Sequence, residues 1–330
     1  MKASFPSGRA LPGVAIAGAT ALISGVSVYV NSFGVHSFSS PAVYTTAKNL
    51  MATIALIVVT ILAWRRRHGA RSAADRFVGT PAAHERHALG AGQWLGLAYV
   101  GVVGGALAFV LFFNGLAVSQ PASAAFWRDT LVLWVAVLAV AFLGERLRWW
   151  NVAVMALLVA GEIVATGGVG QLGADRGELY VLASSVLWAG EIVVARRLLT
   201  TLAPATLALA RMGVGALTLI VYLALNGSLG ALASLSAGQL GWALWTGLLL
   251  AAYVATWMSA LARARALDVT SILVASALVT WTLQLVAGTA VPAPSSLGLL
   301  LIAAGVILLF WAVRRRPQVA AVRDATGPCR

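Results

Sequence analysis

The hydrophobic positions of this chain form long apolar runs separated by short polar connectors. Most runs lack the polar stripe that marks the exposed face of a soluble amphipathic helix. An apolar helix of about 20 residues crosses the roughly 30 Å hydrocarbon core of a bilayer. The pattern therefore predicts an all-α polytopic membrane protein with ten transmembrane helices. Their approximate spans are 11–33, 42–64, 92–117, 121–143, 149–169, 179–195, 204–225, 239–261, 269–290 and 296–313.

Composition supports a membrane location. Charged residues make up 10% of the chain, against about 25% in soluble domains, and the mean hydropathy is +0.90. The net charge of +13 raises the alternative of nucleic-acid binding. We exclude nucleic acid as a partner, because the basic residues lie mainly in connectors. The single cysteine, Cys329, supplies neither a disulfide nor a metal site, and we expect no cofactor.

The basic residues are distributed unevenly between alternate connectors. With both termini inside, 19 of the 23 Lys and Arg fall on the cytoplasmic side, Arg176 falls outside, and three lie within runs. The positive-inside rule then predicts a multi-pass protein of the inner (plasma) membrane, with cytoplasmic N- and C-termini. The first run, which follows Lys2 and Arg9, resembles a signal peptide, but we expect it to be retained as the first helix.

The longest connector lies within residues 65–91, and its polar part, 65–87, has no apolar period. We predict a flexible cytoplasmic loop there. His84 and His87 have HxxH spacing, but a solvated loop is a more frequent setting for such a pair than a metal site.

Two segments indicate an internal repeat. Pro41 and Lys48 have the same spacing as Pro204 and Arg211, and residues 143–161 align with residues 287–305. Because each unit has five helices, the second unit crosses the membrane in the opposite sense. We predict a first five-helix repeat over 1–170, an inverted repeat over 171–316 and a cytoplasmic tail over 317–330. Inverted repeats are typical of secondary transporters, which bind substrate near the midplane.

The same positions carry a family resemblance. They are the Pro-to-cation spacings, Gly144-Glu145-Arg146 closing the fourth run, the small-residue-Gly pairs at Gly161 and Gly305, and Trp188. In their order and spacing, these motifs resemble the EamA-type ten-helix proteins of the drug/metabolite transporter superfamily. The chain departs from the pattern at Lys48, where Arg is usual, at Ser24-Gly25, where Trp is common, and at Gly288-Thr289, where Gly-Glu is expected. The resemblance implies a transporter of small organic molecules and leaves the substrate open.

Six ionisable residues lie within the apolar runs: Lys48, Arg128, Asp129, Glu162, Glu191 and Arg211. Such groups are costly in a bilayer, so they pair with one another or face a wet cavity. Counting along the helices places the first four roughly 10 Å from the outer edge and the last two roughly 10 Å from the inner edge. We expect Lys48 to approach Asp129 or Glu162. Two readings stay open, which are static ion pairs between helices and a substrate or proton pathway.

Glu191 is the strongest candidate for a functional acid. It shares a predicted layer with Arg211, its expected partner, and lies one helical turn from Trp188. Glu162 and Glu191 align with Val306 and Val28 of the other repeat, so a symmetric architecture requires no acid at either position. We expect Glu191→Gln to abolish pH-dependent transport with folding nearly intact. The Trp188 ring beside a carboxylate suits an organic cation or an amino-acid ammonium.

The chain has no Walker motif, so we expect a secondary transporter rather than an ATP-driven pump or another enzyme. The favoured function is export of small organic metabolites, amino acids or drugs, with protons as a coupling ion. The expected partners are this small-molecule substrate and membrane lipids, and the protein is expected to be a monomer or homodimer. The alternatives are an uncoupled facilitator or exchanger, a membrane scaffold and a lipid-modifying enzyme.

Overall fold

The computed structural model describes residues 10–74, 89–119, 126–165, 167–168, 175–287 and 293–314. These residues form helices joined by turns, with no strand among them. The pair His84 and His87, Cys329, the predicted tail 317–330 and the predicted start of the fourth helix lie outside the described residues.

Eight helices in the described part of the chain are long and apolar enough to cross a membrane. They are Pro12–Ser37, Pro41–Arg66, Ala91–Val118, Phe126–Leu143, Arg176–Leu198, Pro204–Leu225, Ala237–Arg263 and Ala266–Gln284. Two shorter apolar helices cover Trp149–Ala165 and Ser296–Ala312. Each predicted run coincides with one of these segments, so the all-helical membrane fold is confirmed. Ten spans arranged as inverted repeats stay a prediction.

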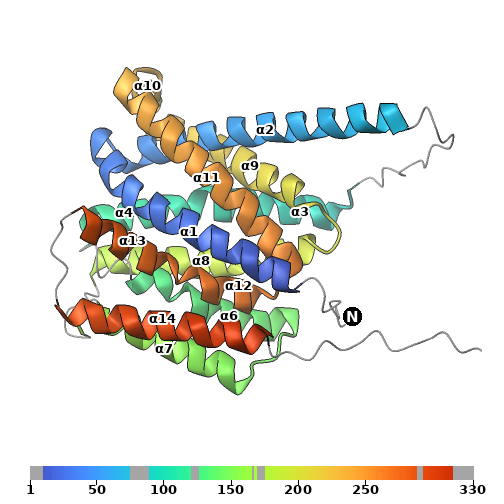
Figure 1. The fold of residues 1–330 in the computed structure, drawn as a ribbon. Coiled ribbons are helices and arrows are strands. Elements are labelled where there is room, and N and C mark those ends of the chain that lie inside the picture. Colours follow the sequence, from blue (N-terminus) through green and yellow to red (C-terminus); the bar gives the residue numbers. More distant parts are fainter. Residues whose placement is uncertain are drawn as a thin grey trace, which may run out of the picture.

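The elements are bounded as follows: α1 Ala10–Gly34, η2 Val35–Ser37, α2 Pro41–Ala74, α3 Ala91–Tyr99, η3 Val100–Leu107, α4 Ala108–Val118, α6 Leu131–Leu143, α7 Trp149–Ala165, α8 Arg176–Leu198, α9 Pro204–Leu225, α10 Leu229–Ala233, α11 Ala237–Arg263, α12 Ala266–Leu273, α13 Ser276–Val286 and α14 Ala293–Arg314. Figure 1 shows them as a bundle, with the start of α1 and the end of α2 at one end and α10 at the other.

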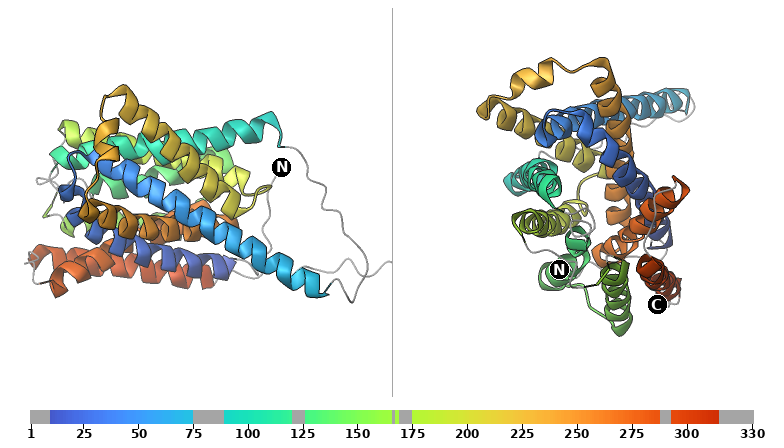
Figure 2. Two further views of the ribbon diagram at one scale, coloured as in Figure 1. Left: turned by 90° about the horizontal axis from the view of Figure 1, so that it is seen from above. Right: turned by 90° about the vertical axis from the view of Figure 1, so that its left-hand side faces the viewer.

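Helices from both halves of the chain pack against one another. α1 packs on α11, α12 and α13, and α8 packs on α4 and α6. α7 and α14 lie together at one edge, opposite α2, α9 and α10 (Figure 2). Large apolar side chains on the outer faces, such as Ile61 and Leu62, are exposed, as expected for helices surrounded by lipid.

The predicted loop at residue 65 is wrong for its first ten residues. α2 continues as a helix through Ala74 and projects beyond the rest of the bundle (Figure 1). Arg and Ala are among the strongest helix formers, so the segment extends the helix after the apolar pattern has ended. Loss of hydrophobicity marks the end of a membrane span, not the end of a helix.

Two predicted helices are irregular near their middles. The third run contains a π-helical stretch, η3, between α3 and α4. The ninth run is broken at Val274 and Ala275, between α12 and α13. The apolar pattern gave no sign of either feature, because both keep the run hydrophobic. Irregular backbone at membrane depth occurs where it is buried in protein or lines a cavity.

The Gly-Glu-Arg motif joins the two halves of the chain. Gly144 ends α6 in the left-handed conformation, with φ of 65°. The Glu145 carboxylate accepts hydrogen bonds from the backbone N–H groups of Ala266, at 2.9 Å, and Leu267, at 3.3 Å. It therefore caps the N-terminus of α12, where an anion is favoured by the helix dipole. Arg265 lies 3.5 Å from the same carboxylate.

Candidate functional site

A cavity at the centre of the bundle collects residues from both halves of the chain. It encloses about 870 Å³ of empty space, part of it open to solvent. Its lining comes from α1, α2, α4, α6, α8, α9, α11, α12 and the helical turn at residues 126–129, before α6. Six of the seven predicted site residues line it: Lys48, Arg128, Asp129, Trp188, Glu191 and Arg211.

The predicted pairing of Glu191 with Arg211 is confirmed. Arg211 donates from Nε to Glu191 Oε1 at 2.7 Å and from Nη2 to Oε2 at 3.1 Å. Both side chains are almost fully buried, with exposed fractions of 5% for Arg211 and 2% for Glu191. A two-point bond between guanidinium and carboxylate is the strongest common geometry for such a pair. It joins α8 to α9 beside the cavity.

The irregular helix η3 supplies a backbone acceptor to this cluster. The Gly104 carbonyl accepts a hydrogen bond from Trp188 Nε1 and another from Arg211 Nη2, both at 3.1 Å. The next carbonyl, of Gly105, accepts from Asn49 Nδ2 at 3.1 Å. A π-helical turn changes the regular backbone ladder, which makes carbonyl groups available to side chains. Trp188 therefore lines the cavity as predicted, and its indole N–H is held by the backbone of η3.

The helices approach closely at the same place. A Cβ atom at Gly104 would collide with the carboxyl end of Glu191, and one at Gly105 would collide with the Arg211 carbonyl oxygen. Small residues such as these let helices approach closely. The groups packed against these two glycines are the Glu191 side chain and the Arg211 backbone.

Arg128 and Asp129 form a second ion pair in the cavity wall. Asp129 Oδ1 accepts from Arg128 Nε at 2.8 Å and from Nη2 at 2.6 Å. Ser185 of α8 donates to the carbonyl oxygens of Trp127 and Arg128, each at 3.2 Å. The turn that carries the pair is thereby fixed to α8.

Lys48 contacts an amide and aromatic rings. Its Nζ donates to Asn31 Oδ1 at 3.3 Å and lies 4.6 Å from the Phe113 ring centroid and 5.1 Å from that of Tyr44. In the described part of the chain it forms no ion pair with Asp129 or Glu162. Asp129 is engaged by Arg128, whereas aromatic faces attract the ammonium through their quadrupoles.

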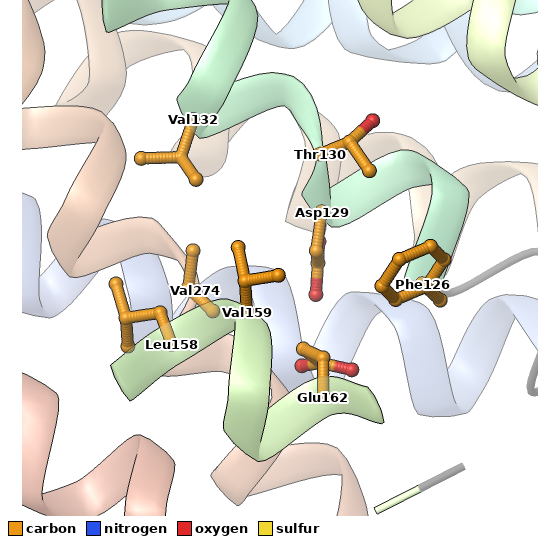
Figure 3. A pocket seen from close by; sticks show the side chains of 8 residues that line it. All are labelled: Phe126, Asp129, Thr130, Val132, Leu158, Val159, Glu162 and Val274. Atoms are coloured by element: carbon orange, nitrogen blue, oxygen red, sulfur yellow. The ribbon is translucent and has the colours of Figure 1, made fainter. Parts of the chain in front are cut away.

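Glu162 lies in a second, smaller cavity next to the first. Its walls include Phe126, Leu158 and Val159, and Asp129 lines both cavities. Figure 3 shows the Asp129 and Glu162 side chains pointing toward one another from the α6 side and from α7. All seven predicted site residues thus border two neighbouring cavities that share Asp129.

Other cavity residues escaped the sequence reasoning. Asn31, Tyr44, Phe109, Phe113 and Tyr253 surround the charged groups, yet each looks like ordinary helix composition by itself. A polar stripe in α1 was the available signal, because Ser24, Ser27 and Asn31 are spaced to share one face of an otherwise apolar helix. Among the described residues no cluster of His, Cys, Asp and Glu is suited to hold a metal ion.

Comparison with known proteins agrees with this architecture. No curated protein matches the chain. A solved crystal structure shares the fold with a TM-score of 0.70, over 93% of this chain and 99% of that chain, at 19% identity. Residues 11–167 match the model of the EamA-like transporter family, which confirms the resemblance drawn from the motifs. Over these residues, just under half of the chain, the protein is similar to the EamA-like transporter family.

Proposed function

We propose that the protein is a secondary transporter that moves a small organic molecule across the inner membrane by alternating access, in the export direction and coupled to protons. The observation that carries the proposal is the central cavity, in which charged residues from α2, α8, α9 and the turn before α6 meet. Ionisable residues at membrane depth mark substrate and ion pathways. A scaffold would have no need for an open cavity at this place.

Helix packing supports the inverted repeat within this proposal. Suppose that the helices of the second half correspond in order to those of the first. The packing of α1 against α11 is then equivalent to the packing of α8 against α4. Likewise, the packing of α1 against α12 and α13 is equivalent to the packing of α8 against α6. The pairs α2 with α9 and α7 with α14 each join two equivalent helices. All of these packing pairs are present, as expected for two related units that face each other.

A matching pair of close contacts gives the same support at the level of residues. Gly105 packs against the carbonyl oxygen of Arg211. Gly247 packs against the carbonyl oxygen of Lys48, and a Cβ atom at Gly247 would lie 2.9 Å from that oxygen. Lys48 and Arg211 are the two cations at equivalent positions after Pro41 and Pro204. Alternating access in such transporters proceeds by movement of one repeat against the other around the binding site.

We place the basic end of the bundle in the cytoplasm, with both termini. At this end Arg265 donates to the Arg146 carbonyl and Arg197 to the Phe142 carbonyl, whereas α10 at the other end follows a connector without Lys or Arg.

The orientation is tested with single cysteines in a Cys329→Ser background. Ala74→Cys, at the end of α2, is expected to react with a membrane-impermeant maleimide only after the cells are permeabilised. Ser234→Cys, exposed just after α10, is the matched control and is expected to react in intact cells. The reverse labelling pattern would overturn the orientation.

Asp129 and Glu162 are the pair that we assign to proton coupling. They face one another with Arg128 as the neighbouring cation, and acids inside membrane proteins are the usual components of proton relays. The Glu191 carboxylate, by contrast, is held at both oxygens by Arg211. The structure therefore favours the outer acids over Glu191 as the groups that exchange a proton.

Glu162→Gln is expected to remove the dependence of uptake on a pH gradient while leaving substrate exchange without a gradient. The amide keeps the shape of the side chain but cannot bind and release a proton. Initial rates in proteoliposomes, with and without a pH gradient, measure the effect. Asp175→Asn, an exposed acid at the start of α8, is the control. An unchanged pH response in Glu162→Gln would remove this pair from the coupling mechanism.

Transport itself is tested in the same proteoliposomes by counterflow of radiolabelled organic acids, amines and amino acids. Movement without any response to pH would favour the uncoupled facilitator or exchanger. Failure of every compound class to move would favour a scaffold or a lipid-modifying enzyme.

A further inference from the structure

The central cavity has one more cation than it has carboxylates. Its described lining contains three cations and two carboxylates. Arg211 is paired with Glu191, and Arg128 is paired with Asp129. Lys48 is the cation that remains without an ion pair in the described part of the chain. A buried charge is costly unless an opposite charge compensates it.

Lys48 is positioned to receive a ligand. Lys48 is 3% exposed and lines the cavity, and its Nζ lies beside the rings of Phe109 and Phe113. An ammonium group has three N–H donors, and Asn31 Oδ1 accepts only one of them. The remaining donors have aromatic faces as neighbours, which attract an ammonium more weakly than an anion does.

The wall beside Lys48 is built to keep this geometry. Asn31 Nδ2 donates to the Ser27 carbonyl at 2.6 Å and to Ser27 Oγ at 2.9 Å, which fixes the amide oxygen toward Lys48. Tyr44 donates its hydroxyl to the same oxygen. Ser24, one turn earlier on α1, adds another hydroxyl to the lining.

Apart from the two ion pairs, Tyr253 and the polar face of α1, the rest of the cavity lining is apolar. Phe112, Trp188, Leu250, Trp257 and Leu273 contribute aromatic and aliphatic surface. The cavity thus combines one unpaired cation with a large apolar surface.

We propose that Lys48, with Asn31 and Ser24 beside it, is the anion-recognition site for a monocarboxylate that carries an apolar or aromatic body. This inference rests on the proposed function, because it names the substrate class of the same cavity. A dianion would need a second cation without a partner. A substrate ammonium would need a carboxylate that has no cationic partner. Both carboxylates of the cavity have one, because Arg211 binds Glu191 and Arg128 binds Asp129. The aromatic surface near Glu191 therefore serves the body of the substrate, not a cation.

The test is direct binding to the purified full-length protein in lipid nanodiscs, measured by isothermal titration calorimetry. The probes are 3-phenylpropionate, its neutral amide, 3-phenylpropylamine and phenylalanine, which share an aromatic body and differ in charge. We expect 3-phenylpropionate to bind about 10- to 100-fold more tightly than the amide, the range of one charged hydrogen bond, and the amine not to bind. Tighter binding of the amine or of phenylalanine would overturn the assignment.

Lys48 is then changed to Met, which keeps an unbranched side chain one atom shorter and without charge. Lys48→Met is expected to lose the preference for propionate over amide, and Lys48→Arg to retain it. Arg66→Met, an exposed position of the same helix, is the control and is expected to bind like the unchanged protein. If Lys48→Met fails to fold, loss of the preference in Asn31→Leu is the alternative test. An unchanged preference in the folded variant would overturn the inference.

Binding and transport fail separately in these experiments. A protein that exchanges amines or neutral compounds in proteoliposomes but does not bind 3-phenylpropionate contradicts the carboxylate site and leaves the transporter function intact. A protein that binds 3-phenylpropionate through Lys48 and moves no compound contradicts the transporter function.

Discussion

Glu191→Gln is expected to abolish transport and to lower the free energy of unfolding by about 3–5 kcal/mol, the usual cost of removing one partner from a buried ion pair. Arg211 would then keep its charge at a position that is 4% exposed, with the Gly104 carbonyl as its remaining strong acceptor. This result differs from the expectation drawn from the sequence, in which folding stays nearly intact. The measurements are thermal unfolding in nanodiscs and counterflow in proteoliposomes.

The matched control is the double variant Glu191→Gln/Arg211→Gln. With both charges removed, no uncompensated charge is left, so most of the lost stability is expected to return. Transport is expected to remain absent, because we propose that this pair opens and closes as the cavity changes access. A double variant that transports at the original rate would show that the pair only holds α8 and α9 together, which is the static alternative.

Gly105→Ala is expected to have a comparably large effect on folding. The added methyl group would collide with the Arg211 carbonyl oxygen and lie 3.0 Å from Gly215 Cα. Overpacking of a core costs about 1–3 kcal/mol when side chains can move, and we expect more than about 3 kcal/mol here because the obstacles are backbone atoms. Loss of the folded peak in size-exclusion chromatography would detect this destabilisation.

Gly92→Ala provides the control for this substitution in the same membrane span. A Cβ at Gly92, in α3, meets open space. The change is expected to leave the protein folded and to raise stability by about 0.4–1 kcal/mol, because alanine restricts the unfolded chain. Equal behaviour of the two variants would mean that α9 does not pack against η3 as closely as the structure has it.

The helices themselves could be predicted from the sequence because a bilayer imposes a length on every span. The ends of α9, for example, agree with the predicted run at both residues, Pro204 and Leu225. The extension of α2 to Ala74 could not be predicted from the same signal, since hydropathy reports the surrounding solvent and not the backbone. The break between α12 and α13 was missed for a related reason, because residues on either side of it remain apolar.

The site was predicted in part. Depth counting correctly joined Glu191 to Arg211, because two opposite charges at one depth have few other partners in an apolar layer. The same counting placed Lys48 near Asp129 or Glu162 but did not give the contacts that it makes, since depth does not give the direction in which a side chain leaves its helix. In the structure the Lys48 ammonium contacts Asn31 and the rings of Tyr44 and Phe113.

The sequence by itself determined that this protein is a helical membrane protein that resembles a transporter family, where its apolar helices lie and which residues carry charge inside them. These properties follow from hydrophobic length and from the cost of charge in lipid, and both are local quantities. Only the tertiary structure decided that Arg128 pairs with Asp129 and that Lys48, among the described residues, is the cavity cation without an ion pair. Pairing depends on the rotation and close approach of helices far apart in the chain, which small residues such as Gly104 and Gly105 permit.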